Sequence, residues 1–576
     1  MENKYFKFRI LLVGIFFLTA FAAIGAKAVH LQVYRGAWLS EKASDQYEKS
    51  LTIPGRRGII YDRNLNEMAV SIDVTSIAAY PARVENPKAA AKALARVLGL
   101  KASALKKTLS APKSFVWVKR QSTAKETIAV KKLEIPGIDF VTEYNRYYPN
   151  TTLAAQVLGF TGIDGAGLEG IEFYYNRYLK GADSEITVFK DARGNGYRVD
   201  PGPSAETGGH NLVLTIDNTI QYIAESALQE AVDEYSALSG LALVMNPQTG
   251  AVLAMAHYPF YNPNSYSDFE KPVWRNRALT DNFEPGSTMK IFSAAAALEH
   301  GKISPQQIFF CENGTYRIGR NVVHDIHKHA WLSLQQIVKY SSNIGAVKVV
   351  EQVGPRNLYR TLSDFGFGRK TGIDSAGETP GSLTPYSSWS KIDTGAISFG
   401  HGVSVSAIQL VPAVSAIANG GNLMKPYLVS DIVDQNGNVI NVAKPQTVKR
   451  AISTRTATIV KNILKTVITE GGTGVNAALD GYTVCGKTGT ARKLDENGKY
   501  SRDRHTASFV GFAPADNSKI TVLVIIDEPQ GEKYYGGIVA APVFKRIAQQ
   551  TLNYLNVPPD DNTFKLRVSR TDGARG

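Results

Sequence analysis

One apolar run near the N-terminus constrains the architecture of this chain more than any other feature. It extends from Ile10 to Ala26, and at 17 residues it is at the short end for a helix that spans a bilayer. Residues 28–29 can lengthen it, because the long side chain of Lys27 can reach the membrane surface. No second run of this kind follows in the sequence, so we expect one transmembrane helix over residues 10–29.

Three cations, Lys4, Lys7 and Arg9, precede the run. Segments rich in Lys and Arg stay on the cytoplasmic side of a membrane. We therefore expect residues 1–9 to form a short cytoplasmic tail and the chain beyond the helix to lie outside the cytoplasm.

A cleaved signal peptide is the alternative interpretation of this segment. Its apolar core would span about 7–15 residues and end at small side chains. The run here is longer and leads into "KAVHLQVYRG", which continues a helical apolar pattern, so a retained anchor is favoured. The small residues that keep the alternative open are Ala22, Ala23, Gly25 and Ala26.

The chain is basic, with 65 Lys and Arg against 51 Asp and Glu and a net charge of +14. The excess is spread along the sequence without a zinc-finger or RNA-binding signature, so we expect no nucleic-acid partner. A basic protein beside anionic lipid and wall polymer is the preferred interpretation. The only cysteines, Cys311 and Cys485, are expected to be free and buried, although a bond between them stays open.

Residues 30–209 have the pattern of a mixed α/β module without obvious catalytic groups. Short apolar pieces flank a turn at Asp62–Asn66, and residues 84–135 alternate helical stretches with loops. Arg57 and Asp62 are interpreted as ion-pair and turn residues of this module rather than as catalytic groups.

From about residue 210 the pattern becomes that of an α+β domain. The segments "NLVLTI" and "LALVMNPQTGAVLAMAHY" predict strands, with a helix between them that Asp217 can cap. Helical patterns fill the middle from Ser287 to about Leu464, and strands return in "GYTVCGKTGTA", "TASFVGFAP" and "KITVLVIID". We expect an antiparallel sheet flanked by helices, a final helix beginning near Ala541, and a mobile polar tail over residues 557–576.

The segment "EPGSTMKIF" supplies a candidate nucleophile and base. Pro285 and Gly286 end a loop and a helical pattern follows, so Ser287 and Lys290 share one helix face. A serine hydroxyl needs an adjacent base, and lysine can serve if burial or a nearby cation lowers its pKa. Alone, S-x-x-K occurs by chance in many helices.

The segment "YSSNIG" contains Ser341 and Asn343, a hydroxyl and an amide on a loop. Together they can relay a proton and hold a substrate amide. By itself the pattern is as compatible with helix capping or turn chemistry.

The segment "CGKTGTA" has the pattern of a strand. Alternation places Thr488 and Thr490 on one face, where they can bind a carboxylate, and Lys487 and Gly489 on the other. Gly489 would allow a helix to approach closely. The backbone N–H groups of Ser287 and Thr490 are the candidates for an oxyanion hole.

The three segments together are far more specific than any one of them. In the order S-x-x-K, S-D-N and K-T-G, on helix, loop and strand, they form the set known from class A β-lactamases and penicillin-binding proteins, and the middle segment here reads S-S-N. Over nearly its whole length the chain resembles a class B penicillin-binding protein, a peptidoglycan D,D-transpeptidase. The likeness is carried by "RGIIYDRN", "YYP", "GLEGIE", "VMNPQTGAVLAMA", "EPGSTMK", "SSNIG", "KTGT" and "GGIVAAPVF".

The resemblance implies a dimerisation-type pedestal domain over residues 30–209 and a transpeptidase domain over residues 210–556, with the five-stranded antiparallel sheet of serine β-lactamases. The segments "FGFGRKTGI" and "SFGHGVSV" are most similar to the cell-division branch, the penicillin-binding protein 3 (FtsI-like) type. The implied location is the bacterial cytoplasmic membrane at the division septum, with the catalytic domain outside. The implied partners are stem peptides, β-lactams, a SEDS-family (FtsW-like) glycosyltransferase and other divisome membrane proteins, without a cofactor.

The same resemblance implies roles for single residues. Ser287 is the nucleophile that attacks the D-Ala-D-Ala bond, and Lys290 is its base. The other residues that it implies are the proton relay of Ser341 and Lys487, the amide-binding Asn343, and the carboxylate site of Thr488, Gly489 and Thr490.

Three places depart from the usual family pattern without replacing a catalytic group. Met289 stands where an aromatic residue is common, and His401 where a neutral polar residue is common. Ser406–Ala407 stands where Thr-Pro is usual, which could loosen the start of a helix.

Histidines at 324, 327 and 329, near Asp325, could suggest a metal site. They lie in a loop pattern, and serine chemistry needs no metal. A surface loop close to the cleft is therefore preferred, and no metal is expected.

Two other functional classes stay open. A carboxypeptidase or β-lactamase would use the same residues on water, but it needs neither the pedestal nor the anchor. A penicillin sensor would not need the complete catalytic set. An elongation role instead of a division role, the acceptor amine, β-lactam affinities and assembly state also stay open.

Overall fold

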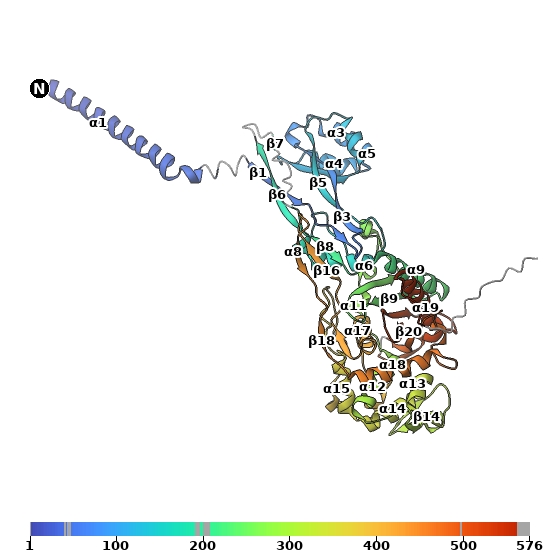
Figure 1. Cartoon of the computed structure of the whole chain (residues 1–576). Helices are drawn as coiled ribbons and strands as arrows, with labels where there is room; N and C mark the ends of the chain where they lie inside the picture. The colour runs from blue at the N-terminus through green and yellow to red at the C-terminus, as the bar shows by residue number, and fades with distance from the viewer. Residues whose placement is uncertain are drawn as a thin grey trace, which may run out of the picture. The chain divides into compact units, whose positions relative to one another are not determined.

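The computed structural model describes residues 2–39, 42, 48–190, 196–199, 208–495 and 498–560 (Figure 1). Its contacts divide the chain into two compact units. The first comprises residues 1–56, 72–145 and 181–208, and the second comprises residues 57–71, 146–180 and 209–576. Two earlier segments, residues 57–71 and 146–180, are thus grouped with the C-terminal unit. The expected tail lies outside the described residues from residue 561 onward.

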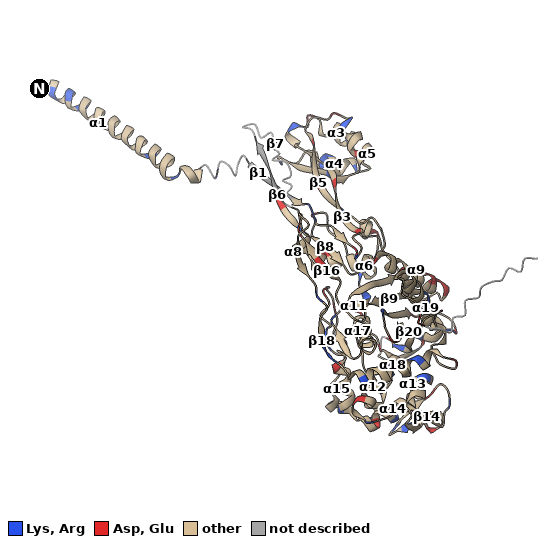
Figure 2. Ribbon diagram, viewed as in Figure 1, with Lys and Arg blue, Asp and Glu red and all other residues tan. Residues whose placement is uncertain are grey.

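The N-terminal helix, α1 (Glu2–Val29), continues into a π-helical turn, η1 (His30–Tyr34). Residues 3–34 form the one helix among the described residues that is long and apolar enough to cross a membrane. Figure 2 shows Lys and Arg at the start of α1, followed by a long uncharged stretch. The helix suggests a single-pass membrane anchor, and the predicted span over residues 10–29 lies within it.

Two antiparallel arrangements lie in the rest of the first unit, where β5 (Ile138–Tyr147) also pairs with β3. One is a three-stranded sheet in the order β1 (Glu48–Gly55), β6 (Gly181–Lys190) and β7 (Gly196–Val199). The other pairs the end of β3 (Glu67–Ala79) with β4 (Val116–Ser122) and places three short helices around a small apolar core. These helices, α3 (Pro87–Leu98), α4 (Ala102–Leu109) and α5 (Ala124–Lys131), are the helical stretches predicted for residues 84–135.

A five-stranded antiparallel sheet forms the centre of the second unit, as predicted. All neighbouring strands in this sheet pair antiparallel. Its two edge strands are β10, from the early part of the domain, and β19, from the late part. Its order is β10 (Val252–Tyr258), β9 (Ser239–Met245), β21 (Ile520–Asp527), β20 (Tyr500–Ala513) and β19 (Cys485–Leu494). Apolar side chains of β9 and β21 are almost completely buried, as expected for strands covered on both faces.

Two terminal helices of the second unit, α9 (Asn218–Glu234) and α19 (Gly536–Tyr554), pack against each other and against this sheet (Figure 1). Asp217 caps α9 as predicted, since its carboxylate accepts from the backbone N–H groups of Thr219 and Ile220. The prediction that the last helix begins near Ala541 was wrong. Proline favours the first turn of a helix, but Pro542 lies inside α19. Because proline has no N–H, the Ile538 carbonyl loses its helical hydrogen bond. This carbonyl accepts instead from the Tyr235 hydroxyl at 3.5 Å.

Helices fill the chain between the early and late strands, as the pattern from Ser287 to Leu464 predicted. Among them α17 (Ala407–Ala418) is buried along its whole length and packs on β9, β20 and β21. The departure at Ser406–Ala407 could have loosened its start, but Gln409 Oε1 accepts the Ser406 N–H at 2.9 Å and closes the first turn. The others are α12 (Lys290–His300), α13 (Leu334–Tyr340), α14 (Asn343–Val353), α15 (Pro355–Asp364), α16 (Lys391–Ser398) and α18 (Thr454–Ile468).

The turn at Asp62–Asn66 is present, with Asp62 Oδ1 accepting the N–H groups of Asn64 and Asn66 at 2.8 Å. Nearby, Glu172 is completely buried between two arginines. Arg57 Nε and Arg146 Nε each lie 2.5 Å from one of its carboxylate oxygens. Arg57 is therefore an ion-pair residue, as predicted.

The charges and the cysteines behave as the sequence indicated. Figure 2 shows Lys and Arg interspersed with Asp and Glu rather than gathered into one basic block. Cys311 and Cys485 are both buried and both free.

Candidate active site

Ser287 lies in a single 3₁₀ turn, η5 (Gly286–Met289), directly before α12. It lines a cavity of about 570 Å³ in the second unit. The side chain of Lys290, the first residue of α12, is buried beneath it, and Lys290 Nζ lies 3.0 Å from Ser287 Oγ. The spacing of three residues therefore brings the two groups together, as helical periodicity requires.

The amine of Lys290 has the environment that a base needs. Burial lowers its pKa to about 7, and the carboxylate of Asp325 opposes this shift only partly. Besides Ser287, the amine contacts the Ser341 carbonyl oxygen at 2.7 Å, Ser341 Oγ at 3.1 Å and Asn343 Oδ1 at 2.7 Å. Near neutral pH a substantial fraction is neutral and able to accept a proton.

Ser341 and Asn343 lie where α13 ends and α14 begins. Ser341 has a left-handed backbone with φ of +62°, which reverses the chain and turns its hydroxyl toward the lysines. Its Oγ lies 3.1 Å from the amine of Lys290 and 3.1 Å from that of Lys487. The loop thus connects the first and third sequence segments through one hydroxyl.

Lys487, on β19, is completely buried. Burial, and then the nearby cation of Lys290, hold its pKa well below the usual value. Its amine also donates to Thr488 Oγ1 at 3.1 Å, and Thr488 donates to Thr473 Oγ1 at 3.0 Å. Thr473 lines the cavity, and the sequence did not single it out.

The close approach of η5 to β19 depends on small residues. A Cβ at Gly489 would lie 3.0 Å from Thr288 Cγ2 and 2.3 Å from Ser508 Oγ. A Cβ at Gly286 would lie 3.1 Å from the Thr490 carbonyl oxygen, so the backbone of the nucleophile turn runs beside that of Thr490. Thr490 lines the cavity, and its hydroxyl accepts the Gly536 N–H at 3.0 Å.

Asp325 is the residue whose importance the sequence did not indicate. One of its oxygens accepts the backbone N–H of Asn343 at 2.5 Å and that of Ile344 at 3.0 Å. The other accepts the hydroxyl of Ser342. Asp325 therefore fixes the N-terminus of α14, and with it the S-S-N segment.

The histidine loop belongs to the cavity rim. His327 and His329 line the cavity, and His329 stacks on Tyr340 with ring centroids 5.3 Å apart. The His324 carbonyl oxygen accepts from Asn343 Nδ2 at 3.1 Å. No cluster of metal-ligating side chains occurs among the described residues. The remaining walls are mostly apolar or aromatic, with Ile326, Phe399, Val475, Tyr535 and Ile538 beside the polar Asn476.

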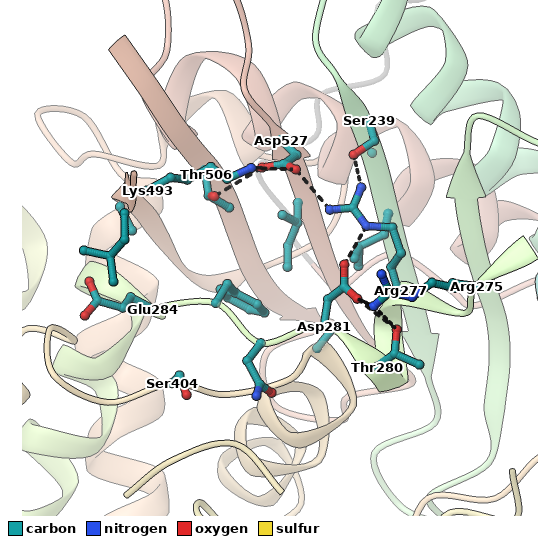
Figure 3. A pocket seen from close by; sticks show the side chains of 18 of the residues that line it. Ser239, Arg275, Arg277, Thr280, Asp281, Glu284, Ser404, Lys493, Thr506 and Asp527 are labelled. Atoms are coloured by element: carbon teal, nitrogen blue, oxygen red, sulfur yellow. Dashed lines mark hydrogen bonds and ion pairs between the residues drawn. The ribbon is translucent and has the colours of Figure 1, made fainter. Parts of the chain in front are cut away.

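A second cavity, also about 570 Å³, lies beside the segment that leads to Ser287 (Figure 3). Its floor is a row across four strands, in which Ala491, Thr506, Asp527 and Ser239 are successive register partners. Figure 3 shows the Arg277 side chain directed at Ser239, Asp527 and Asp281.

This network connects the catalytic sheet to the chain that enters the nucleophile turn. Arg277 binds Asp527 at 3.0 Å from the loop side, and Lys493 Nζ binds the same carboxylate at 3.0 Å from β19. Asp527 thus binds both segments whose backbones meet at Gly286 and Thr490.

A serine beside a buried lysine, at the edge of a five-stranded antiparallel sheet, defines the class of serine acyltransferases that includes β-lactamases and penicillin-binding proteins. Residues 240–549 match the penicillin-binding protein transpeptidase domain, and residues 52–214 match the penicillin-binding protein dimerisation domain. The chain belongs to the class B penicillin-binding proteins, the family of peptidoglycan D,D-transpeptidases.

Individual relatives agree with this family. The chain is 36% identical to the probable peptidoglycan D,D-transpeptidase PbpC of Pseudomonas aeruginosa, over 97% of this chain and 98% of that protein. It is 33% identical to the peptidoglycan D,D-transpeptidase FtsI of Escherichia coli, over 97% of this chain and 95% of that one. The crystal structure of a peptidoglycan synthetase from Bifidobacterium adolescentis is similar with a TM-score of 0.71 and 26% identity, over 89% of this chain and 98% of that chain.

Proposed function

We propose that this protein cross-links peptidoglycan stem peptides through an acyl-enzyme on Ser287. The observation that carries the proposal is the contact of 3.0 Å between Ser287 Oγ and a lysine amine whose pKa burial lowers to about 7. This contact gives Ser287 the neutral base that a serine hydroxyl needs in order to act as a nucleophile.

In the first half of the reaction, Ser287 Oγ attacks the carbonyl carbon of the penultimate D-Ala while Lys290 takes the hydroxyl proton. The backbone N–H groups of Ser287 and Thr490 stabilise the charge on the carbonyl oxygen. The C–N bond then breaks, and Ser341 with Lys487 delivers a proton to the departing amine of D-Ala. The contacts of Ser341 Oγ with both lysines support this relay.

Substrate binding uses the remaining residues of the three segments. Asn343 holds the amide of the donor peptide, while Thr488 and Thr490, next to Gly489, bind the terminal carboxylate beside the Lys487 charge. An amine of a neighbouring stem then attacks the acyl-enzyme and releases Ser287. β-Lactams would acylate the same serine, because they present a strained amide at the position of the D-Ala-D-Ala bond.

Labelling with a fluorescent penicillin tests this chemistry. We expect a long-lived adduct on the native protein and none on Ser287→Ala. Rapid turnover of the adduct would indicate a β-lactamase instead. A stable adduct in a protein that trims D-Ala but forms no cross-link would indicate a carboxypeptidase, and an adduct without any turnover of peptide would indicate a sensor.

We further propose that the protein acts at the division septum of a bacterium, anchored in the cytoplasmic membrane with its N-terminus inside and the catalytic unit outside. A relative named FtsI and the segments "FGFGRKTGI" and "SFGHGVSV" support this role. The partner would be a SEDS-family (FtsW-like) glycosyltransferase with other divisome proteins. Imaging a tagged protein tests the assignment, since a signal along the lateral wall would favour an elongation role.

A further inference from the structure

The Ser287 cavity contains an ionisable side chain that the chemistry above does not use, His401. Its Nδ1 lies 2.6 Å from Glu284 Oε2. A carboxylate can only accept a hydrogen bond, so this ring nitrogen carries the hydrogen and the lone pair of the neutral ring lies on Nε2.

Several contacts fix the carboxylate of Glu284. Its Oε1 accepts the Gly402 N–H at 2.9 Å, and Tyr500 donates its hydroxyl to both oxygens at 3.1 Å. Burial alone would raise the pKa of Glu284, but hydrogen bonds from His401, Gly402 and Tyr500 outweigh burial and lower it. The carboxylate is therefore ionised when it holds the imidazole.

The imidazole is also held by its ring contacts. The rings of Phe399 and Tyr500 meet it edge to face, with centroid distances of 5.5 and 5.3 Å. Its side chain remains 29% exposed. A ring that is oriented on three sides and still reaches solvent can meet a group that enters the cavity.

The backbone brings His401 close to the nucleophile turn. Gly400, the residue before it, accepts the Gly286 N–H at 3.3 Å, and Gly286 is the residue before Ser287. A Cβ at Gly400 would lie only 2.1 Å from the Gly286 carbonyl oxygen. The two loops are therefore in direct backbone contact one residue away from both side chains.

The amines of Lys290 and Lys487 already form hydrogen bonds on the Ser341 side of the site. Lys290 Nζ has contacts with Ser287, Ser341 and Asn343, and Lys487 Nζ has contacts with Ser341 and Thr488. Among the other lining histidines, neither His327 nor His329 has a carboxylate partner within the part of the chain that the structure describes. His401 is the imidazole that a carboxylate orients.

We propose that Glu284 and His401 form a carboxylate–imidazole base that takes the proton of the acceptor amine in the second half of the reaction. This inference rests on the proposed function. The neutral amine attacks the acyl carbon, the new C–N bond forms, and one N–H proton passes to His401 Nε2. The bond from the acyl carbon to Ser287 Oγ then breaks, and the serine takes back the proton that Lys290 has kept since acylation. His401 releases its proton to water, and Lys487 recovers from water the proton that it gave through Ser341 to D-Ala.

The test separates the two halves of the reaction with a benzoyl-D-alanyl thioester as donor and glycinamide as acceptor. Thiol release measures acylation of Ser287, and the yield of benzoyl-D-alanyl glycinamide measures aminolysis. In His401→Asn we expect aminolysis to fall about 100-fold, the typical contribution of a general base, while acylation changes by less than about threefold. Glu284→Gln, which keeps the volume of the side chain and removes its charge, should affect the same step.

Controls make each outcome decisive. His300→Asn, at the C-terminal end of α12, should leave both rates unchanged. Compared at equal concentrations of neutral glycinamide, the rise of the native aminolysis rate with pH should be smaller in His401→Asn, which a merely structural role would not produce. An equal fall of both rates, or unchanged aminolysis, would overturn the proposal, whereas a native protein that no thioester or penicillin acylates would contradict the proposed function itself.

Discussion

The amine nitrogen of Lys290 lies 3.0 Å from the hydroxyl oxygen of Ser287, and the same amine lies 2.7 Å from Asn343 Oδ1. A residue that follows the nucleophile by three positions thus also binds the loop that supplies the second catalytic segment. Its protonation state therefore affects both the nucleophile and the loop.

We expect the rate of acylation by penicillin to rise with pH through about 7. Burial lowers the pKa of Lys290 to about 7, and only the neutral amine, which predominates above that pH, can take the serine proton. Below that value the rate should fall about tenfold per pH unit. The second-order acylation rate constant, measured over about two pH units on either side, gives the profile. A flat profile would show that Lys290 is not the base.

Asp325→Asn should lower the rate of acylation without abolishing it. The substitution keeps the volume but removes the charge that accepts the N–H groups of Asn343 and Ile344. Hydrogen bonds to charged groups contribute about 1.5–3 kcal/mol, so we expect acylation by penicillin to fall about 10- to 100-fold and the melting temperature to drop. Asp364→Asn, whose carboxylate pairs with Lys449 on the surface, is the control. Equal effects of the two substitutions would contradict a specific role of Asp325.

Gly400→Ala should abolish penicillin labelling. A Cβ there would lie 2.1 Å from the Gly286 carbonyl oxygen, and the backbone φ of +89° is already unfavourable for alanine. Gly437→Ala is a matched control, because its φ is +85° and nothing lies within 4 Å of its Cβ position. Comparing the two variants by melting temperature and labelling rate separates backbone strain from the clash. Retained labelling in Gly400→Ala would show that the two loops can separate without loss of function.

Glu172→Gln should lower the free energy of unfolding by about 3–5 kcal/mol, the usual cost of breaking a buried ion pair. The reason is that Arg57 and Arg146 would keep their charges in a buried site without the carboxylate that binds both. Chemical denaturation measures the loss, and Glu67→Gln, an exposed carboxylate of the same unit, should change stability by less than about 0.5 kcal/mol. Labelling of the folded fraction should persist, because Glu172 lies outside the catalytic cavity. A loss comparable with that of Glu67→Gln would contradict the role of this ion pair.

Much of the second unit could be predicted, because its elements have strong local signals. Continuous apolar runs gave the strands of the central sheet, and Asp217 marked the start of α9. The start of α19 was mispredicted, since a hydroxyl from another element, that of Tyr235, partly replaces the hydrogen bond that Pro542 removes. No local pattern contains that information.

The positions of Glu284 and His401 show the same limit within the site. His401 stood out only as a departure from the family pattern, and Glu284 did not stand out at all. The two residues are 117 positions apart, and only the contact between the Gly400 loop and the nucleophile turn brings them to 2.6 Å.

The nucleophile and its base could be identified from local sequence, because helical periodicity places residues three positions apart on one face, whatever the rest of the fold does. The apolar N-terminal helix could also be identified from the sequence, because its length and composition are enough to predict it. The groups that surround that pair depend instead on long-range packing. Asp325 reaches Asn343 across 18 positions and Lys487 reaches Ser341 across 146, distances at which packing of whole elements, and not backbone geometry, fixes the contact.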